Sequence, residues 1–330
     1  MKNITVFAVL VIILFCTQHV PAQEQRAYAV SVRPLFGLVS GHAEELVYPA
    51  GDTKAPLLSE LLWNMKPVFF YGVLLDFSQI RPIERWGFFS NISVKNGIPG
   101  PSGNHENRDW MSVENTNITH YSKHDNYTRE LLLLDASAGF SFPHKKLLFK
   151  TYVNVSYMRF SFYGKDGQGT YARQQMDSFN NPVPGLFYPI TSNPYVVPWE
   201  GKVISYSQDW LYVAPGISAG YYFFDKFFAE LSFIASPLVF CVGLDEHKTT
   251  NVQYKDNMRG GILLEPGLRL SYTAGRWLGI FWDISWRFAN GTRGASYNRS
   301  PIGTGAYIKE GEAGAGLSIM TTGFGLNVRL

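Results

Sequence analysis

The sequence has few cysteines, few charges and no long apolar run beyond its first twenty residues. Two of the 330 residues are cysteine, and charged residues make up 17% of the chain, below the usual quarter. A low charge content combined with 15% aromatic residues excludes an intrinsically disordered chain. The net charge of +3 argues against nucleic-acid binding through a basic surface. Because no later segment supplies about 20 consecutive apolar residues, a membrane-spanning helix is excluded there.

The first segment is typical of a secretory signal. Residues 1–3 carry one positive charge, residues 4–16 are almost wholly apolar, and a small residue, Ala22, follows at a plausible cleavage position. We therefore predict a signal peptide at residues 1–22 and a mature domain at residues 23–330. A short membrane anchor is the alternative, but the apolar stretch is too short for one.

Beyond the signal, apolar residues alternate with polar or small ones along segments of roughly ten residues, which is the period of a β-strand. In residues 63–77 the apolar odd-numbered positions would share one face of a strand: Trp63, Met65, Pro67, Phe69, Tyr71, Val73, Leu75 and Phe77. Both a soluble β-sandwich and a β-barrel in lipid alternate in this way.

The connections between these segments favour the barrel. Short connections, at 78–84, 143–146, 224–226 and 273–276, alternate with long ones, at 50–57, 97–126, 164–202, 246–259 and 290–310. Short turns at one end and long loops at the other are typical of outer-membrane barrels. The nine connections separate ten strands, and closing them into a ring leaves no unpaired edge in hydrocarbon. We predict an all-β, ten-stranded antiparallel transmembrane β-barrel.

The polar face of these strands would line the interior of the barrel. Eight charged residues point inward in this reading: Asp76, Asp135, Glu230, Glu265, Arg269, Asp283, Arg287 and Arg329. Because a barrel of this strand count has a lumen that side chains can fill, we expect a paired charge network rather than a pore. A small porin or transporter stays as an alternative function.

Two clusters in the long connections carry candidate chemistry. One is Asn107-Arg108-Asp109-Trp110-Met111, and the other is Asp245-Glu246-His247. In an extended segment Asp245 and His247 lie on one face, so the carboxylate can orient the imidazole and raise its basicity. Such a histidine can take a proton from water, and a second carboxylate across a groove could hold that water. Solvated loop residues are the alternative interpretation.

Other chemistries have weaker support. A metal site could draw on His105, His120, His124 and His247 with Asp109 or Asp245, but no paired ligand spacing is present, and we predict no metal or cofactor. No Gly-x-Ser-x-Gly elbow is present. Cys241, the single cysteine outside the predicted signal, lies in an apolar strand and excludes an internal disulfide.

At these residues the sequence resembles the omptin family, the outer-membrane proteases of Gram-negative bacteria. Gly37-Leu38-Val39-Ser40-Gly41 followed by Glu45-Leu46-Val47-Tyr48 is similar to the family's first-strand motif. The 107–111 cluster is similar to its Asp-Gln-Asp-Trp-Met, and the 245–247 cluster matches its Asp-Glu-His. The motifs occur in the family's order and spacing, and the resemblance spans nearly the whole mature chain.

The resemblance implies an endopeptidase that cleaves peptide or protein substrates at the cell surface with an activated water. His247 would be the general base, Asp245 would orient it, and Asp109 would help to position the water. Glu45 matches one carboxylate of a pocket that favours cuts beside basic residues. The resemblance also implies activation by lipopolysaccharide on the outer wall, where Arg159 matches one lipid-binding arginine.

Two departures from the family pattern bear on activity. Asn107 stands in place of the first catalytic aspartate, and an amide carries no negative charge and cannot accept a proton. We therefore weigh a proteolytically impaired omptin relative, acting as an adhesin or surface-binding protein, as the alternative. Gly243 stands where the family has its second specificity carboxylate. Strict alternation from Phe227 would also turn His247 outward, so we predict a β-bulge, with Pro237 as its candidate site.

Overall fold

The computed structural model describes residues 28–49, 56–79, 86–114, 116–224, 226–248, 251–275, 277–299 and 307–329. The predicted signal peptide at residues 1–22 lies outside these described residues. Among them, no helix is long and apolar enough to cross a membrane.

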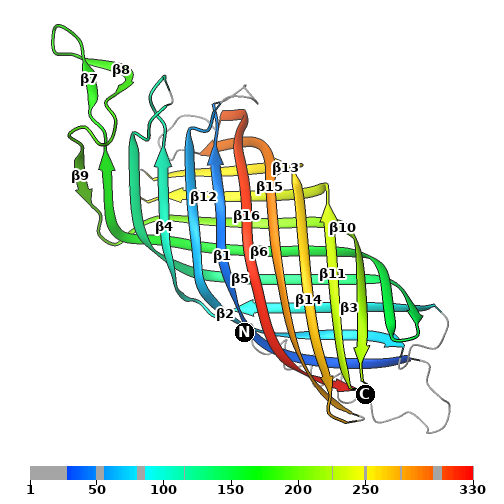
Figure 1. Ribbon diagram of the computed structural model, residues 1–330. Coiled ribbons are helices and arrows are strands. Elements are labelled where there is room, and N and C mark those ends of the chain that lie inside the picture. The colour runs from blue at the N-terminus through cyan, green and yellow to red at the C-terminus, as the bar shows by residue number, and fades with distance from the viewer. Residues whose placement is uncertain are drawn as a thin grey trace.

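The described chain is built almost entirely from antiparallel strands (Figure 1). Their bounds are β1 Tyr28–Val47, β2 Ser59–Gln79, β3 Gly87–Gly97, β4 Gly100–Asp109, β5 His120–His144, β6 Leu147–Tyr171, β7 Gln174–Met176, β8 Pro182–Phe187, β9 Tyr195–Pro198, β10 Lys202–Phe223, β11 Phe227–Ser236, β12 Leu238–His247, β13 Val252–Arg259, β14 Ile262–Thr273, β15 Leu278–Arg299 and β16 Tyr307–Arg329.

The large sheet closes on itself. Antiparallel pairing continues from strand to strand around the sheet, β6 pairs with β10, and β16 pairs with β1, so the order forms a ring. Each position in the ring holds either one long strand or two shorter strands placed end to end, and we call each position a stave. Three staves consist of two strands: β3 with β4, β11 with β12, and β14 with β13. Counting these pairs once gives the ring of about ten strands, which confirms the predicted all-β barrel.

The strands are longer than a bilayer requires. The long strands of 20 to 25 residues, at about 3.4 Å per residue and a tilt of about 40°, project roughly 50–65 Å along the barrel axis, against an apolar band of about 25 Å. Tight turns such as that between His144 and Leu147 lie at the same end as Tyr28 and Arg329, the first and last described residues. The far end, where β1, β4 and β12 finish, therefore extends beyond the lipid; we call it the outer rim.

The wall below the outer rim exposes a belt of large apolar side chains, as a lipid-facing surface must. It includes Phe36, Phe69, Tyr71, Phe88, Ile92, Phe142, Phe149, Val153, Ile217, Phe223, Leu231, Phe233, Leu270, Ile280, Phe324 and Leu326. Trp86, Tyr221 and Trp277 are exposed near the turn end of this belt, as in the aromatic girdles of such barrels.

Two prolines mark two of the places where the alternation reverses. Between β10 and the β11–β12 stave, the pair Gly216 and Ile234 is followed by Val213 and Leu238, so the second stave carries one extra residue. Pro237 lies in that interval, which confirms the predicted bulge. Residues before the bulge, such as Phe233, expose their odd-numbered positions, whereas Phe240 beyond it exposes an even-numbered one.

A second extra residue corrects our assignment of faces in β2. The register shifts between Val39 and Gly41 of β1, opposite Val68 and Met65 of β2, and the extra residue lies in the interval that contains Pro67. Phe69 is 59% exposed to lipid, but Trp63 and Met65 are fully buried inside the barrel. The prediction that all the odd-numbered residues of 63–77 share one face was therefore wrong, because it assumed an unbroken strand.

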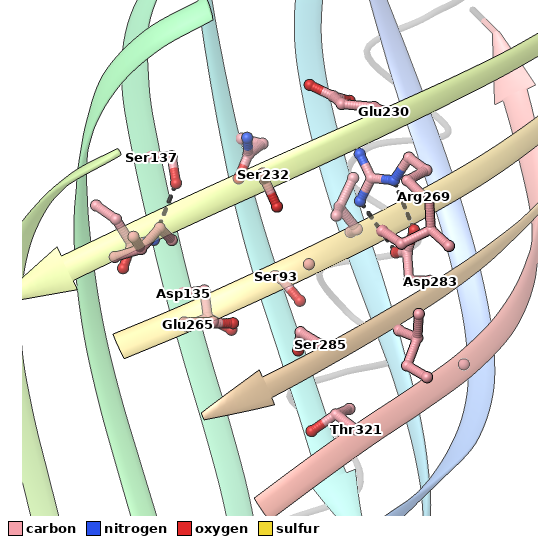
Figure 2. A pocket seen from close by; sticks show the side chains of 18 of the residues that line it. Ser93, Asp135, Ser137, Glu230, Ser232, Glu265, Arg269, Asp283, Ser285 and Thr321 are labelled. Atoms are coloured by element: carbon pink, nitrogen blue, oxygen red, sulfur yellow. Dashed lines mark hydrogen bonds and ion pairs between the residues drawn. The ribbon is translucent and has the colours of Figure 1, made fainter. Parts of the chain in front are cut away.

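Paired charges fill the middle of the barrel. Arg287 bonds both Asp135, at 2.6 Å, and Glu265, at 2.8 Å. Arg269 pairs with Asp283 at 2.6 Å (Figure 2), and Lys150 with Glu230 at 2.7 Å. The space left among these side chains is a cavity of about 180 Å³. The network matches the predicted paired plug.

The predicted long loops are mostly strands in the structure. Residues 100–109 form β4 and residues 252–259 form β13, while β5 and β6 continue past the lipid belt to His120 and Tyr171. The candidate residues therefore stand on hydrogen-bonded strands at the outer rim and not on loops. A strand holds a side chain more rigidly than a loop, which suits a site that depends on alignment.

Candidate active site

Asp245 and His247 lie on the inner face at the end of β12. The bulge at Pro237 turns the odd-numbered residues of β12 inward, so both side chains point into the mouth of the barrel. His247 Nε2 lies 2.6 Å from Asp245 Oδ2. The Asp245 side chain is only 3% exposed, while that of His247 is 39% exposed. The carboxylate is thus sealed behind a ring whose other side is open to water.

Asp109 ends β4 and is held by two donors. The Ser59 hydroxyl on β2 donates to Asp109 Oδ1 at 2.5 Å, and the Asn107 amide donates to Asp109 Oδ2 at 3.3 Å. Ser59 and Asp109 are directly paired across β2 and β4, which accounts for the contact. The neighbour Glu106 instead pairs with Arg108 and Lys123, away from this group.

The two clusters face one another across the mouth. In the ring β4 lies between β2 and β5, and β12 lies between β10 and β13, four staves away. The Asp109 and His247 charges are nonetheless close enough to influence each other. Burial lowers the pKa of His247. The hydrogen bond to Asp245 and the charges of Asp245 and Asp109 outweigh this effect, so the pKa of His247 is raised above the ordinary 6.5.

The pKa of Asp109 is also raised, but in this case burial is the cause. Burial raises the pKa of its carboxyl from 3.8 to about 6, and the hydrogen bonds from Ser59 and Asn107, with the charge of His247, offset part of that rise. At neutral pH the carboxylate is therefore ionised but weakly stabilised, and it is available to accept a hydrogen bond from water. An imidazole and a carboxylate on opposing walls can together orient and deprotonate one water molecule.

A third group of side chains lies deeper on the same inner face. Glu45 on β1, Asp245 on β12 and Asp256 on β13 are 5%, 2% and 5% exposed, and we call them the inner acidic cluster. Burial, followed by the charges of Asp245 and Asp256, raises the pKa of Glu45 well above its ordinary value. The rings of Trp63 and Tyr206, 5.5 Å apart and nearly parallel, pack beside this cluster.

The omptin family profile matches residues 26–330 of the sequence. The chain belongs to the omptin family. Its fold is similar to that of the outer membrane protease OmpT from Escherichia coli, with a TM-score of 0.79 and 14% identity over 94% of this chain and 99% of that one. Like the family, it is an outer-membrane β-barrel protein of Gram-negative bacteria.

Other solved barrels are more distant. The transport unit of the autotransporter AIDA-I from Escherichia coli matches with a TM-score of 0.35 and 10% identity, covering 94% of both chains. The translocator domain of NalP from Neisseria meningitidis matches with a TM-score of 0.33 and 9% identity, covering 100% of this chain and 96% of that one. A search of the curated proteins found no match.

The structure brings five of the six predicted site residues of this omptin to one end of the barrel interior. Asn107, Asp109, Asp245, His247 and Glu45 all lie there. Arg159 lies apart on the outer wall of β6, as period-two alternation predicts, where Nε contacts Glu130 at 2.9 Å and Nη1 contacts Asp209 at 2.8 Å.

The histidines considered as metal ligands have other surroundings. His105 is buried against the Trp63 ring, 4.0 Å between centroids, and His124 contacts the Asp166 carbonyl oxygen at 2.6 Å. Among the described residues, no group of three or more His, Cys, Asp or Glu side chains is arranged to hold a metal ion. Cys241 is buried and faces the interior.

Sequence analysis missed Ser59 and Asp256. Ser59 lies 50 positions from Asp109, and only the pairing of β2 with β4 brings them together. Asp256 carried a usable signal. A hairpin centred after His247 pairs His247 with Val252, and counting back along both strands places Asp256 opposite Gly243.

Proposed function

We propose that this omptin is an endopeptidase of the outer membrane, with its active site at the outer rim and facing outside. The observation that carries the proposal is the Asp245–His247 pair, 2.6 Å apart, set opposite a buried Asp109 that is electrostatically coupled to it. Membership of the family supports protease activity in general, and the geometry supports a hydrolytic route through water.

The reaction assigns one task to each side chain. His247 accepts a proton from a water molecule held against Asp109, and the hydroxide forms a bond to the carbonyl carbon of the scissile peptide. Asp245 keeps the imidazole in the required tautomer and stabilises the imidazolium. The imidazolium then returns the proton to the leaving amine as the C–N bond breaks, so His247 ends the cycle neutral.

Asn107 can serve this route without a negative charge. Two close carboxylates hold one proton between them, and the protonated member donates a hydrogen bond to the ionised one. The Asn107 amide makes the equivalent donation to Asp109 Oδ2 permanently. Together, Asn107 and Asp109 carry one negative charge and one donated hydrogen bond, as two carboxylates that share one proton would. Asn107 therefore acts as a positioning residue for Asp109.

The inner acidic cluster supports cleavage near basic residues. Glu45 is buried, negatively charged when ionised, and adjacent to the catalytic Asp245. A cationic substrate side chain that reached it would bring the counter-charge that a buried carboxylate requires.

Lipopolysaccharide is the lipid partner that we propose for the outer wall. Arg159 lies above exposed Val153 and Val155 on the lipid-facing side of β6. Farther out, Lys165 and Lys202 lie over the rings of Tyr127 and Tyr163, 5.0 Å and 5.7 Å from their centroids. Cations and tyrosines at the headgroup level suit an anionic lipid.

The decisive experiment is a peptide-cleavage assay. The barrel is refolded with and without lipopolysaccharide and given a fluorogenic peptide containing paired basic residues, alongside the variant His247→Ala. We expect cleavage that needs lipopolysaccharide and that falls by about 10²- to 10⁴-fold in the variant. Absence of cleavage, or cleavage that His247→Ala leaves unchanged, would reject the hydrolytic mechanism and favour a surface-binding role.

A further inference from the structure

Gly243 leaves a place on β12 beside the catalytic pair without a side chain, and another strand fills it. A Cβ atom at Gly243 would lie 3.3 Å from the Tyr206 hydroxyl and 3.4 Å from both Cβ and Oδ2 of Asp256. Gly243 and Asp256 are directly paired across β12 and β13. The Asp256 carboxylate therefore lies beside the space that a carboxylate on residue 243 would use.

The inner acidic cluster lacks a compensating cation. Glu45 Oε2, Asp245 Oδ1 and Asp256 Oδ1 are buried and accept no hydrogen bond from any described residue. Within the described part of the chain, no lysine or arginine forms an ion pair with any of the three. Burial raises the pKa of Asp256 to about 6, with a further contribution from the Asp245 charge that Ser296 partly offsets.

The surroundings keep these charges poorly screened. Trp63 and Tyr206 are fully buried or nearly so, and the Trp63 indole N–H points toward Glu45 without reaching normal hydrogen-bond geometry. The buried His105 ring packs against Trp63, and neither of its nitrogens forms a hydrogen bond with a described residue. Polar atoms without a hydrogen-bond partner, packed around Glu45 and Asp256, which form no ion pair with any described residue, are typical of a site that a ligand completes.

We propose that Asp256 is a specificity-determining residue that, together with Glu45, binds the guanidinium or ammonium group of a substrate's arginine or lysine side chain. The second carboxylate is supplied from β13 because β12 carries glycine at position 243. This inference rests on the proposed endopeptidase function for its substrate, but the cation site itself can be measured without cleavage.

The test compares two peptides that differ only by arginine or its neutral isostere citrulline at the cleavage position. The ratio of their kcat/KM values is measured for the wild type, for Asp256→Asn and Asp256→Ser, and for the double variant Gly243→Asp with Asp256→Ser. Calorimetry with n-butylguanidinium measures cation binding in the same proteins without any turnover. Asp125→Asn, which removes an exposed charge from β5, is the matched control.

We expect Asp256→Asn to lower the arginine-to-citrulline ratio by about 10- to 100-fold and to weaken n-butylguanidinium binding by a similar factor. The double variant, which moves the carboxylate to β12, should recover much of both. Variants that fail to fold are identified by their gel mobility with and without heating. If the single Asp256 variants do not fold, the ratio and the affinity of the double variant test the inference. If a folded Asp256 variant keeps both the ratio and the affinity, the inference is overturned.

The two proposals fail in different ways. A wild type that cleaves neither peptide but binds n-butylguanidinium in an Asp256-dependent manner would reject the endopeptidase and support the cation site. A wild type that cleaves both peptides equally and does not bind n-butylguanidinium would support the endopeptidase and overturn the role of Asp256.

Discussion

Replacing Asn107 by aspartate tests whether the amide weakens catalysis or performs the task of a protonated carboxyl group. In Asn107→Asp a second carboxylate would lie about 3.3 Å from Asp109 Oδ2, which is the present length of the hydrogen bond from the Asn107 side-chain amide. At an effective dielectric constant of about 20, two negative charges at that distance repel by about 5 kcal/mol. This energy corresponds to about 3.7 pH units, so the pair would keep one proton near pH 7.

The variant should therefore differ little from the wild type at neutral pH. Its pair would carry one negative charge and one donated hydrogen bond, as Asn107 and Asp109 do now, and kcat/KM should stay within about threefold. The difference should appear at high pH, where the second proton leaves and the repulsion displaces both carboxylates. A falling alkaline limb in the pH profile of kcat/KM, absent from the wild type, is the expected result.

Asn107→Ala supplies the complementary measurement. It removes the hydrogen bond to Asp109 Oδ2 and should lower kcat/KM by about 10- to 150-fold, corresponding to about 1.5–3 kcal/mol for a bond to a charged acceptor. Because that bond lowers the pKa of Asp109, its acid limb should also move to higher pH. Asn117→Asp, an exposed site at the outer rim, controls for added charge. An increase of 30-fold or more in the kcat/KM of Asn107→Asp would refute our reasoning. It would show that the missing negative charge limits the rate of the wild type.

Three further predictions concern the same molecule. Acidification protonates both His247 and Asp109, so kcat/KM of the wild type should rise with pH through about 6 and level off only above the raised pKa of His247; a bell centred below pH 6 would contradict these roles. Arg287→Met leaves the buried Glu265 without its cation and Asp135 with Lys95 alone, 3.6 Å away, and should cost about 3–5 kcal/mol in denaturant unfolding of the barrel, whereas a loss under 1 kcal/mol would show that the network is not structural. Deleting Pro237 should restore unbroken alternation and turn Asp245 outward, abolishing cleavage while the heat-resistant barrel mobility persists; retained cleavage would contradict the bulge as the cause of the inward orientation.

The architecture was accessible from the sequence because lipid imposes a strict pattern. A wall that faces hydrocarbon must be apolar at every second position, and the segments around Phe149 and Ile280 keep to this rule. The interior charges followed from the complementary positions, and Asp135 and Arg287 are paired as expected. Above the lipid this constraint ends, and there the predicted long loops proved to be β4, β13 and the extensions of β5 and β6.

The site was accessible only where its residues are close in sequence or match a family motif. Asp245 and His247 are two positions apart, so extended geometry alone places them together. Ser59 bonds Asp109 through a pairing of β2 with β4 that no short-range pattern encodes. Non-local pairing of this kind depends on the register of the whole ring, which a single sequence does not specify.

Two bulges reverse the inward and outward positions of β2 and of the β11–β12 segment where these strands leave the lipid. Below the outer rim, β2 and β11 must show large apolar side chains to lipid, whereas above it β2 and β12 must turn Trp63, Asp245 and His247 toward the groove. β1 and β10 keep one parity throughout, with Glu45 and Tyr206 buried at the rim and Phe36 and Ile217 exposed in the lipid belt, but without an extra residue β2 and β12 would turn Trp63, Asp245 and His247 away from the interior. One extra residue near Pro67 and another near Pro237 reverse the parity in each strand. Proline suits both intervals because a bulged residue need not donate to the ladder. The inward orientation of Trp63, Asp245 and His247 therefore depends on one extra residue in each of these two strands, at the level where the lipid constraint ends.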